Sequence, residues 1–95
     1  MRLEFDPVKA AANLAKHGLR FEDAWLVLES RYRLDVQVVR GGEQRTQSLS
    51  YVLGYLAVLT VVHTPRGDAV RVISFRRASA QESEAYRDWL EEDIE

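Results

Sequence analysis

Cysteine is absent from this chain of 95 residues, and histidine occurs only twice, at positions 17 and 63. Without cysteine there can be no thiolate nucleophile, no redox dithiol, no disulfide and no zinc site with sulfur ligands. A metal site built on the two histidines would need carboxylates to complete it, and the sequence contains no spacing typical of such a site. A glycine-rich phosphate loop is missing as well. We therefore expect neither a metal nor another cofactor.

Long apolar segments are also missing. The longest nearly apolar run, Tyr55 to Val62, is much shorter than the roughly 20 residues that cross a bilayer. The first four residues, Met1 to Glu4, do not resemble a secretory signal. We therefore expect a cytoplasmic protein that does not bind membranes. Because domains commonly contain about 100–150 residues, residues 1–95 are predicted to form a single domain.

Charge is divided unevenly along the chain. Residues 1–81 contain twelve Lys and Arg against eight Asp and Glu, a net charge of +4, whereas residues 82–95 contain one Arg against seven acids, a net charge of −6. Eleven of the thirteen cations are arginine, whose planar guanidinium binds phosphate well. This division is compatible with an ordinary solvated surface, but also with a basic body that binds a polyanion.

The first helix is predicted over residues 7–16. Asp6 is a suitable N-cap, Pro7 fits the first helical position, and Gly18 ends the helix as a C′ residue. The helical spacing predicts that one apolar face packs on the core, and this face comprises Val8, Ala11, Ala12 and Ala15. The polar side carries Lys9, Asn13, Lys16 and His17.

Two further helices follow from the same spacing. The second is expected over residues 21–29, with Trp25 among its core residues, after Phe21 and Ala24. The last begins with a capping box, Ser79-Ala80-Gln81-Glu82. Its apolar side should pack on the sheet, and consists of Ala85, Tyr86, Trp89 and Leu90. Both tryptophans are expected in the core rather than stacked on bases.

Alternating and apolar segments predict five strands, at residues 2–5, 32–38, 45–52, 55–64 and 69–76. Gly41-Gly42 and the segment 65–68 supply turns between them. The apolar segment 55–64 should be a central strand covered on both faces. The fold class is therefore α+β, with a small antiparallel, possibly mixed, sheet and helices packed on it in the order β-α-α-β-β-β-β-α.

Two blocks of this sequence resemble the BrnT-type toxins of type II toxin–antitoxin modules. The first block is Phe5-Asp6-Pro7-x-Lys9-Ala10-x-x-Asn13-x-x-Lys16-His17-Gly18-x-x-Phe21-Glu22-x-Ala24. The second is His63-Thr64-x-Arg66-Gly67-Asp68-x-x-Arg71-x-Ile73-Ser74-x-Arg76-Arg77-Ala78-x-x-x-Glu82-x-x-x-Tyr86. The resemblance implies a RelE-like ribonuclease fold and an endoribonuclease that inhibits translation. It also implies neutralisation by a cognate antitoxin, which would make any contact of the complex with DNA.

Cleavage of RNA without a metal needs a base for the 2′-hydroxyl, cations for the charge on phosphorus and an acid for the 5′-oxygen. Arg76 and Arg77 close the last strand, and their side chains are predicted on opposite faces. Either could bind phosphate, or one could be solvated while the other forms a salt bridge with Glu82. Lys16 and His17 are the other catalytic candidates, as a phosphate-binding cation and a general acid or base, although a histidine there could equally cap the helix.

Four more residues are candidates for RNA binding: Lys9, Asn13, Arg66 and Arg71. Strand alternation would place Arg71 on one face with Ile73, Phe75 and Arg77. Weaker candidates, with structural alternatives, are Glu82 (the capping box), Tyr86 (the core) and His63 (a hydrogen bond to the turn at 65–68).

Two other classes of function fit the same residues. The protein could bind RNA or the antitoxin without cleaving anything, because binding and catalysis use the same cations. It could also be a small interaction protein whose cations dock an acidic partner, in which case it would have no affinity for RNA. Incubation with RNA in the presence of EDTA distinguishes these hypotheses.

Overall fold

The computed structural model describes residues 1–94, with side chains up to Glu92. The strands are β1 (Leu3–Glu4), β2 (Leu34–Arg40), β3 (Glu43–Val52), β4 (Ala57–Arg66) and β5 (Ala69–Arg77). The α-helices are α1 (Pro7–His17), α2 (Trp25–Leu28) and α3 (Ala80–Ile94), and short 3₁₀ turns lie at Phe21–Asp23 and Leu53–Tyr55. No helix within residues 1–94 has the length and apolar character needed to cross a membrane.

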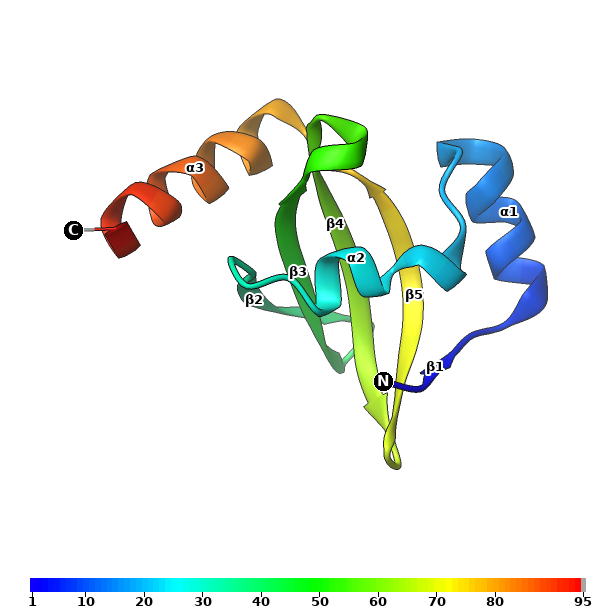
Figure 1. Ribbon diagram of the computed structural model, residues 1–95. Helices are drawn as coiled ribbons and strands as arrows, with labels where there is room; N and C mark the ends of the chain where they lie inside the picture. The colour runs from blue at the N-terminus through cyan, green and yellow to red at the C-terminus, as the bar shows by residue number, and fades with distance from the viewer. Residues whose placement is uncertain (95) are drawn as a thin grey trace.

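The described strands form one sheet in the order β1-β5-β4-β3-β2 (Figure 1). β1 runs parallel to β5, and the other neighbours are antiparallel. The predicted α+β class is therefore confirmed, and the sheet is mixed, which was the second of the two predicted alternatives. Gly41 and Gly42 form the turn between β2 and β3 with φ of 57° and 78°, a backbone region that favours glycine. β4 is a central strand, as expected, but it begins at Ala57 because Tyr55 belongs to a 3₁₀ turn.

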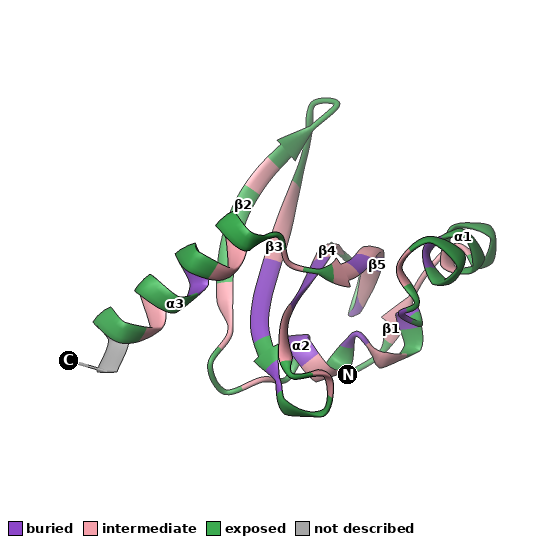
Figure 2. Ribbon diagram, turned by 90° about the horizontal axis from the view of Figure 1, so that it is seen from above, coloured by how far each residue is buried: buried purple, intermediate pink, exposed green. Residues whose placement is uncertain are grey.

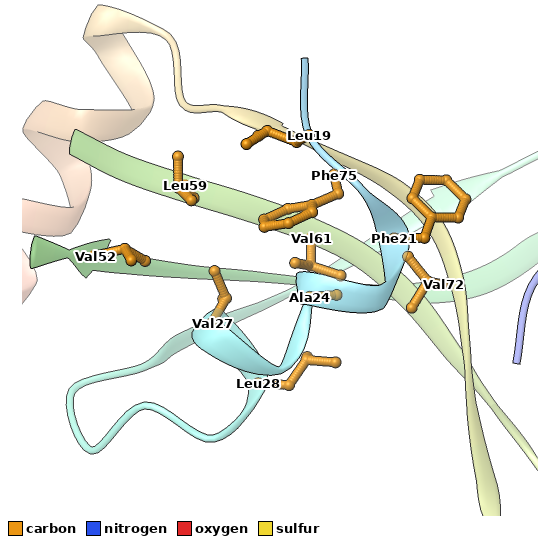
Figure 3. Close-up of a cluster of buried hydrophobic side chains, with 10 residues drawn as sticks. All are labelled: Leu19, Phe21, Ala24, Val27, Leu28, Val52, Leu59, Val61, Val72 and Phe75. Atoms are coloured by element: carbon orange, nitrogen blue, oxygen red, sulfur yellow. The ribbon is translucent and has the colours of Figure 1, made fainter. Parts of the chain in front are cut away.

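The core lies between α2 with its preceding turn and one face of the sheet (Figure 3). Its buried side chains are Leu19, Phe21, Ala24, Val27, Leu28, Val52, Leu59, Val61, Val72 and Phe75. On the opposite face Thr60 is fully buried, whereas Val58 and Val62 are half-buried, so the expectation that β4 is covered on both faces holds only in the middle of the strand. Trp25 is 48% exposed, against the prediction. The 3₁₀ turn at Phe21–Asp23 has three residues per turn. It therefore shifts which residues of the following helix face the core, and Val27 is buried in place of Trp25.

α1 is capped as predicted but faces the sheet with its other side. The Asp6 side chain accepts a hydrogen bond from the Val8 amide at 2.9 Å, and Gly18 adopts φ 72°. The four residues expected in the core are exposed, and Val8 reaches 77%. Asn13 is buried instead, at 8% exposure.

The burial of Asn13 follows from the shortness of β1, which pairs only with Val70 and Arg71 of β5. The outward peptide groups of Phe75 are therefore left without a strand partner, and buried peptide groups need hydrogen bonds. The Asn13 amide donates to the Phe75 carbonyl at 2.7 Å and to the Leu19 carbonyl at 3.1 Å, and its oxygen accepts from the Phe75 N–H at 3.2 Å. The Asn13 side chain thus makes the hydrogen bonds that a longer neighbouring strand would make with the Phe75 backbone.

α3 leaves the end of β5 and points away from the sheet rather than lying across it (Figures 1 and 2). Of its predicted apolar side, Tyr86 is buried and donates a hydrogen bond to the Tyr32 carbonyl at 2.7 Å. Trp89 and Leu90 are half-buried, and Ala85 is exposed. The expectation that the whole apolar side packs on the sheet is therefore wrong, because contact is concentrated at Tyr86.

Candidate nucleic-acid interface

A β-bulge in β5 decides which arginines share a face of the sheet. Val62 pairs with Ser74 and the next residue, His63, pairs with Val72, so Ile73 has no partner on β4. The extra residue reverses the alternation along β5. Arg71 and Arg76 therefore lie on the same face, away from Phe75. The prediction that Arg71 shares a face with Phe75 and Arg77 is wrong for this reason.

The face that carries Arg76 has a groove of about 300 Å³, which we call the arginine groove. Three arginines reach it from three strands: Arg40 from β2, Arg45 from β3 and Arg76 from β5. The remaining lining residues are Val38, Gln47, Val62, Ile73, Ser74 and Glu82. Several guanidinium groups around one depression on an open sheet form a site suited to phosphate groups.

Arg76 is held in place by Glu82. Its two terminal nitrogens donate to the two carboxylate oxygens at 2.8 and 3.0 Å, and the carboxylate also accepts from Gln47 at 2.8 Å and from the Ser79 N–H at 2.8 Å. The Ser79 hydroxyl accepts from the Glu82 N–H at 3.1 Å, so the predicted capping box is confirmed.

These bonds change the acid–base properties of both groups. The hydrogen bond from Arg76 is the main reason that the pKa of Glu82 falls to about 2, with further lowering by Ser79 and Gln47. The same bond raises the pKa of Arg76. Glu82 is therefore a carboxylate near neutral pH. It can orient Arg76, but it is a poor proton donor or acceptor there.

Arg40 and Arg45 were not among the predicted site residues. They flank the Gly41-Gly42 turn, and the alternation of β3 places Arg45 on the same face as Gln47. Extending that alternation back to residue 45 would have indicated this arginine. Its Nε atom is buried and has no hydrogen-bond partner among the described residues, while Glu43 lies 3.5 Å away.

Arg77 does not join the arginine groove. Its guanidinium lies over the ring of Tyr55, 5.9 Å from the centroid. In the β4–β5 register Arg77 lies opposite Leu59, whose side chain is in the core, so Arg77 is on the core face of the sheet. The prediction that Arg76 and Arg77 point to opposite faces is confirmed. The predicted alternative of a salt bridge to Glu82 is also observed, for Arg76.

The other predicted cations lie outside the arginine groove. Arg66 and Arg71 both approach the carboxylate of Glu4, at 3.9 and 3.6 Å, near the turn between β4 and β5. Lys9 and Lys16 are exposed on α1. None of these four lines the arginine groove.

His17 is half-buried and follows Asn13 by one helical turn, so both residues lie on the side of α1 that faces β5. α1 runs beside β5, and its carboxyl end lies at the same end of the molecule as the end of β5 (Figure 1). Lys16 and His17 are the last two residues of α1 and belong to that end of the helix. Asn13 uses its amide groups within the protein and has none to offer RNA.

His63 contacts Ser48 rather than the turn at 65–68, so that prediction is wrong. The Ser48 hydroxyl donates to Asp35 at 2.6 Å and lies 2.7 Å from His63 Nε2. Since the hydroxyl has one hydrogen, Nε2 must donate to the serine oxygen. Burial lowers the pKa of His63. Ser48 is completely buried, so this network ties β2, β3 and β4 together and is not a nucleophilic site.

The described residues, 1–94, contain no group of three or more His, Asp or Glu side chains that could hold a metal ion. The candidate site consists of arginines on an open sheet face. A small α+β protein with such a basic groove is of the class suited to bind polyanions.

Residues 5–82 match the family model described as ribonuclease toxin, BrnT, of type II toxin–antitoxin system, and the chain belongs to this family. Its partner is accordingly an antitoxin and its target is RNA. The predicted family membership is confirmed. No curated protein matches the chain.

Proposed function

We propose that this protein is an endoribonuclease with a RelE-like fold that cleaves RNA in the arginine groove without a metal ion, and so inhibits translation until its antitoxin neutralises it. The observation that carries the proposal is the convergence of Arg40, Arg45 and Arg76 from three strands on one groove. Family membership supplies the class of substrate.

The chemical role of the arginines is to bind the phosphodiester and to stabilise charge on its oxygens as the 2′-hydroxyl attacks phosphorus. Glu82 and Gln47 act as positioning residues for Arg76, because they hold its guanidinium group in a single orientation. Arg45 lines the same groove and adds positive charge to it, while its Nε is buried beside the Glu43 carboxylate, 3.5 Å away. Arg66, Arg71 and Lys9 would extend the basic surface along the RNA backbone.

Proton transfer requires a group from outside the groove lining. The lining contains no imidazole, and its carboxylate, Glu82, has a pKa of about 2. We assign proton transfer to His17 and a phosphate contact to Lys16, since both lie in the last turn of α1, the helix that runs beside β5. Asn13, His63 and Tyr86 have structural hydrogen bonds and receive no role in RNA cleavage.

Independence from metal is proposed because the described residues include no ligand cluster, whereas cations suited to the same charge are present. Contact with DNA is assigned to the antitoxin alone. The second candidate function is binding of RNA without cleavage, which the same arginines would support.

The test is incubation of the purified chain with total RNA in EDTA, using Arg45→Ala and a matched control, Arg20→Ala. Arg20 is an exposed arginine that pairs with Glu22 outside the groove. We expect cleavage by the wild type and by Arg20→Ala, and a loss of about 100-fold for Arg45→Ala. RNA binding without cleavage by the wild type would favour the second candidate. Cleavage that needs added Mg²⁺ would contradict the metal-free mechanism.

A further inference from the structure

A second groove, of about 450 Å³, lies between α3 and the ends of β3 and β4, and we call it the α3 groove. Its apolar lining includes Tyr51, Leu56, Val58, Tyr86 and Leu90. It contains none of the three arginines of the arginine groove. The α3 groove is therefore a separate surface with a different chemistry.

Leu56, which lines this groove, has an unfavourable backbone conformation and an exposed apolar side chain. Its φ is 52°, the only positive value among the described residues other than glycine, and its side chain is 75% exposed. A left-handed backbone costs a residue with a Cβ about 1–3 kcal/mol, and an exposed leucine gains nothing from burial. Leu53, in the same turn, is also 75% exposed. Contacts within the protein do not explain these two leucines, whereas contact with a partner would.

The rim of the groove is basic. Arg77 and Arg87 line it and are exposed, and neither forms an ion pair with a carboxylate among the described residues. An apolar floor lies between two guanidinium groups that have no carboxylate partner among the described residues. This surface is complementary to an amphipathic peptide that carries acidic residues beside its apolar side chains.

A second copy of this chain fits the groove less well. A symmetric contact between two copies brings the same surface of each together, and here it would place two last helices against each other. It would also bring Arg77 and Arg87 of one copy near the same two arginines of the other, and like charges repel.

We propose that the α3 groove is the docking surface for the antitoxin. An amphipathic antitoxin segment places apolar side chains against Leu56 and Leu90, and its acidic residues pair with Arg77 and Arg87. This inference rests on the proposed function only in that it takes the antitoxin as the partner.

The test compares Leu56→Asn and Arg87→Glu with a matched control, Val8→Asn, in the full-length chain. Asparagine tolerates positive φ better than leucine, so Leu56→Asn removes the apolar contact without added backbone strain, and its melting temperature should equal or exceed that of the wild type. Val8 is similarly exposed, at 77%, but lies on α1. The measurement is the Kd for the purified cognate antitoxin by calorimetry at one fixed salt concentration.

We expect Leu56→Asn and Arg87→Glu each to weaken binding by about tenfold or more, and Val8→Asn to leave it unchanged. Binding within about twofold of the wild type for both groove variants would overturn the proposal. So would a wild-type dimer that Leu56→Asn converts to a monomer, because a second copy would then be the occupant. The assay contains no RNA, so a chain that fails to cleave RNA contradicts the proposed function and leaves this result intact.

Discussion

Arg76 and Arg77 are neighbours in the chain, but their side chains lie on opposite faces of the sheet. The Arg76 guanidinium binds the Glu82 carboxylate at 2.8 and 3.0 Å in the arginine groove. Arg77 lies over Tyr55 and lines the α3 groove. Strand alternation separates the two arginines. The α3 groove also includes Tyr51 and Val58 from the face of Arg76, so the two grooves are distinguished by their lining residues.

We expect Arg76→Ala to reduce the rate of RNA cleavage by about 100-fold, because it removes a positioned charge from the groove. Arg77→Ala should retain most of the rate, since its side chain lies on the other face. The measurement is the single-turnover rate on one RNA, with circular dichroism to show that both variants fold. An equal loss in both variants would mean that RNA does not bind in the arginine groove.

Affinity for RNA should fall with increasing salt. Each phosphate contact to single-stranded RNA contributes a slope of about −0.7 to the plot of log affinity against log salt concentration. If the three groove arginines each contact one phosphate, the slope should be about −2. Measurement of the Kd between 50 and 200 mM salt checks this expectation, and Arg45→Ala should make the slope shallower. Affinity that does not change with salt would contradict phosphate binding.

Glu82→Gln should destabilise the fold at neutral pH but not at low pH. Because the pKa of Glu82 is lowered from 4.5 to about 2 in the folded protein, its contribution is complete above about pH 5 and is lost as the pH falls towards 2. We expect a loss of about 1–2 kcal/mol at pH 7 that becomes much smaller near pH 2.5. Urea unfolding at both pH values measures this, and an equal loss at both would contradict the assignment.

Asn13→Ala should lower the free energy of unfolding by about 2–3 kcal/mol, because it leaves the buried N–H and C=O groups of Phe75 without partners. Lys9→Ala, an exposed change on the same helix, should have an effect below about 0.5 kcal/mol. Chemical denaturation of both variants provides the comparison. If Asn13→Ala kept the stability of the wild type but lost affinity for RNA, Asn13 would be an RNA ligand after all.

The amino-acid sequence by itself determined the local structure of this protein. The caps at Asp6 and Gly18, the box of Ser79 with Glu82 and the Gly41-Gly42 turn depend on atoms only a few residues apart. The two motif blocks were likewise sufficient to identify the family. Hydrophobic periodicity was enough to predict the α+β class, but it did not decide between an antiparallel and a mixed sheet.

The tertiary structure decided which side chains meet. The bulge at Ile73 moved Arg71 to the face of Arg76, and the shortness of β1 turned Asn13 inward to the Phe75 backbone. The arginine groove arose because the sheet brings Arg40 and Arg45 beside Arg76, more than thirty residues away in the chain. Such contacts depend on strand register and on unpaired peptide groups of distant segments, which periodicity within one segment does not encode.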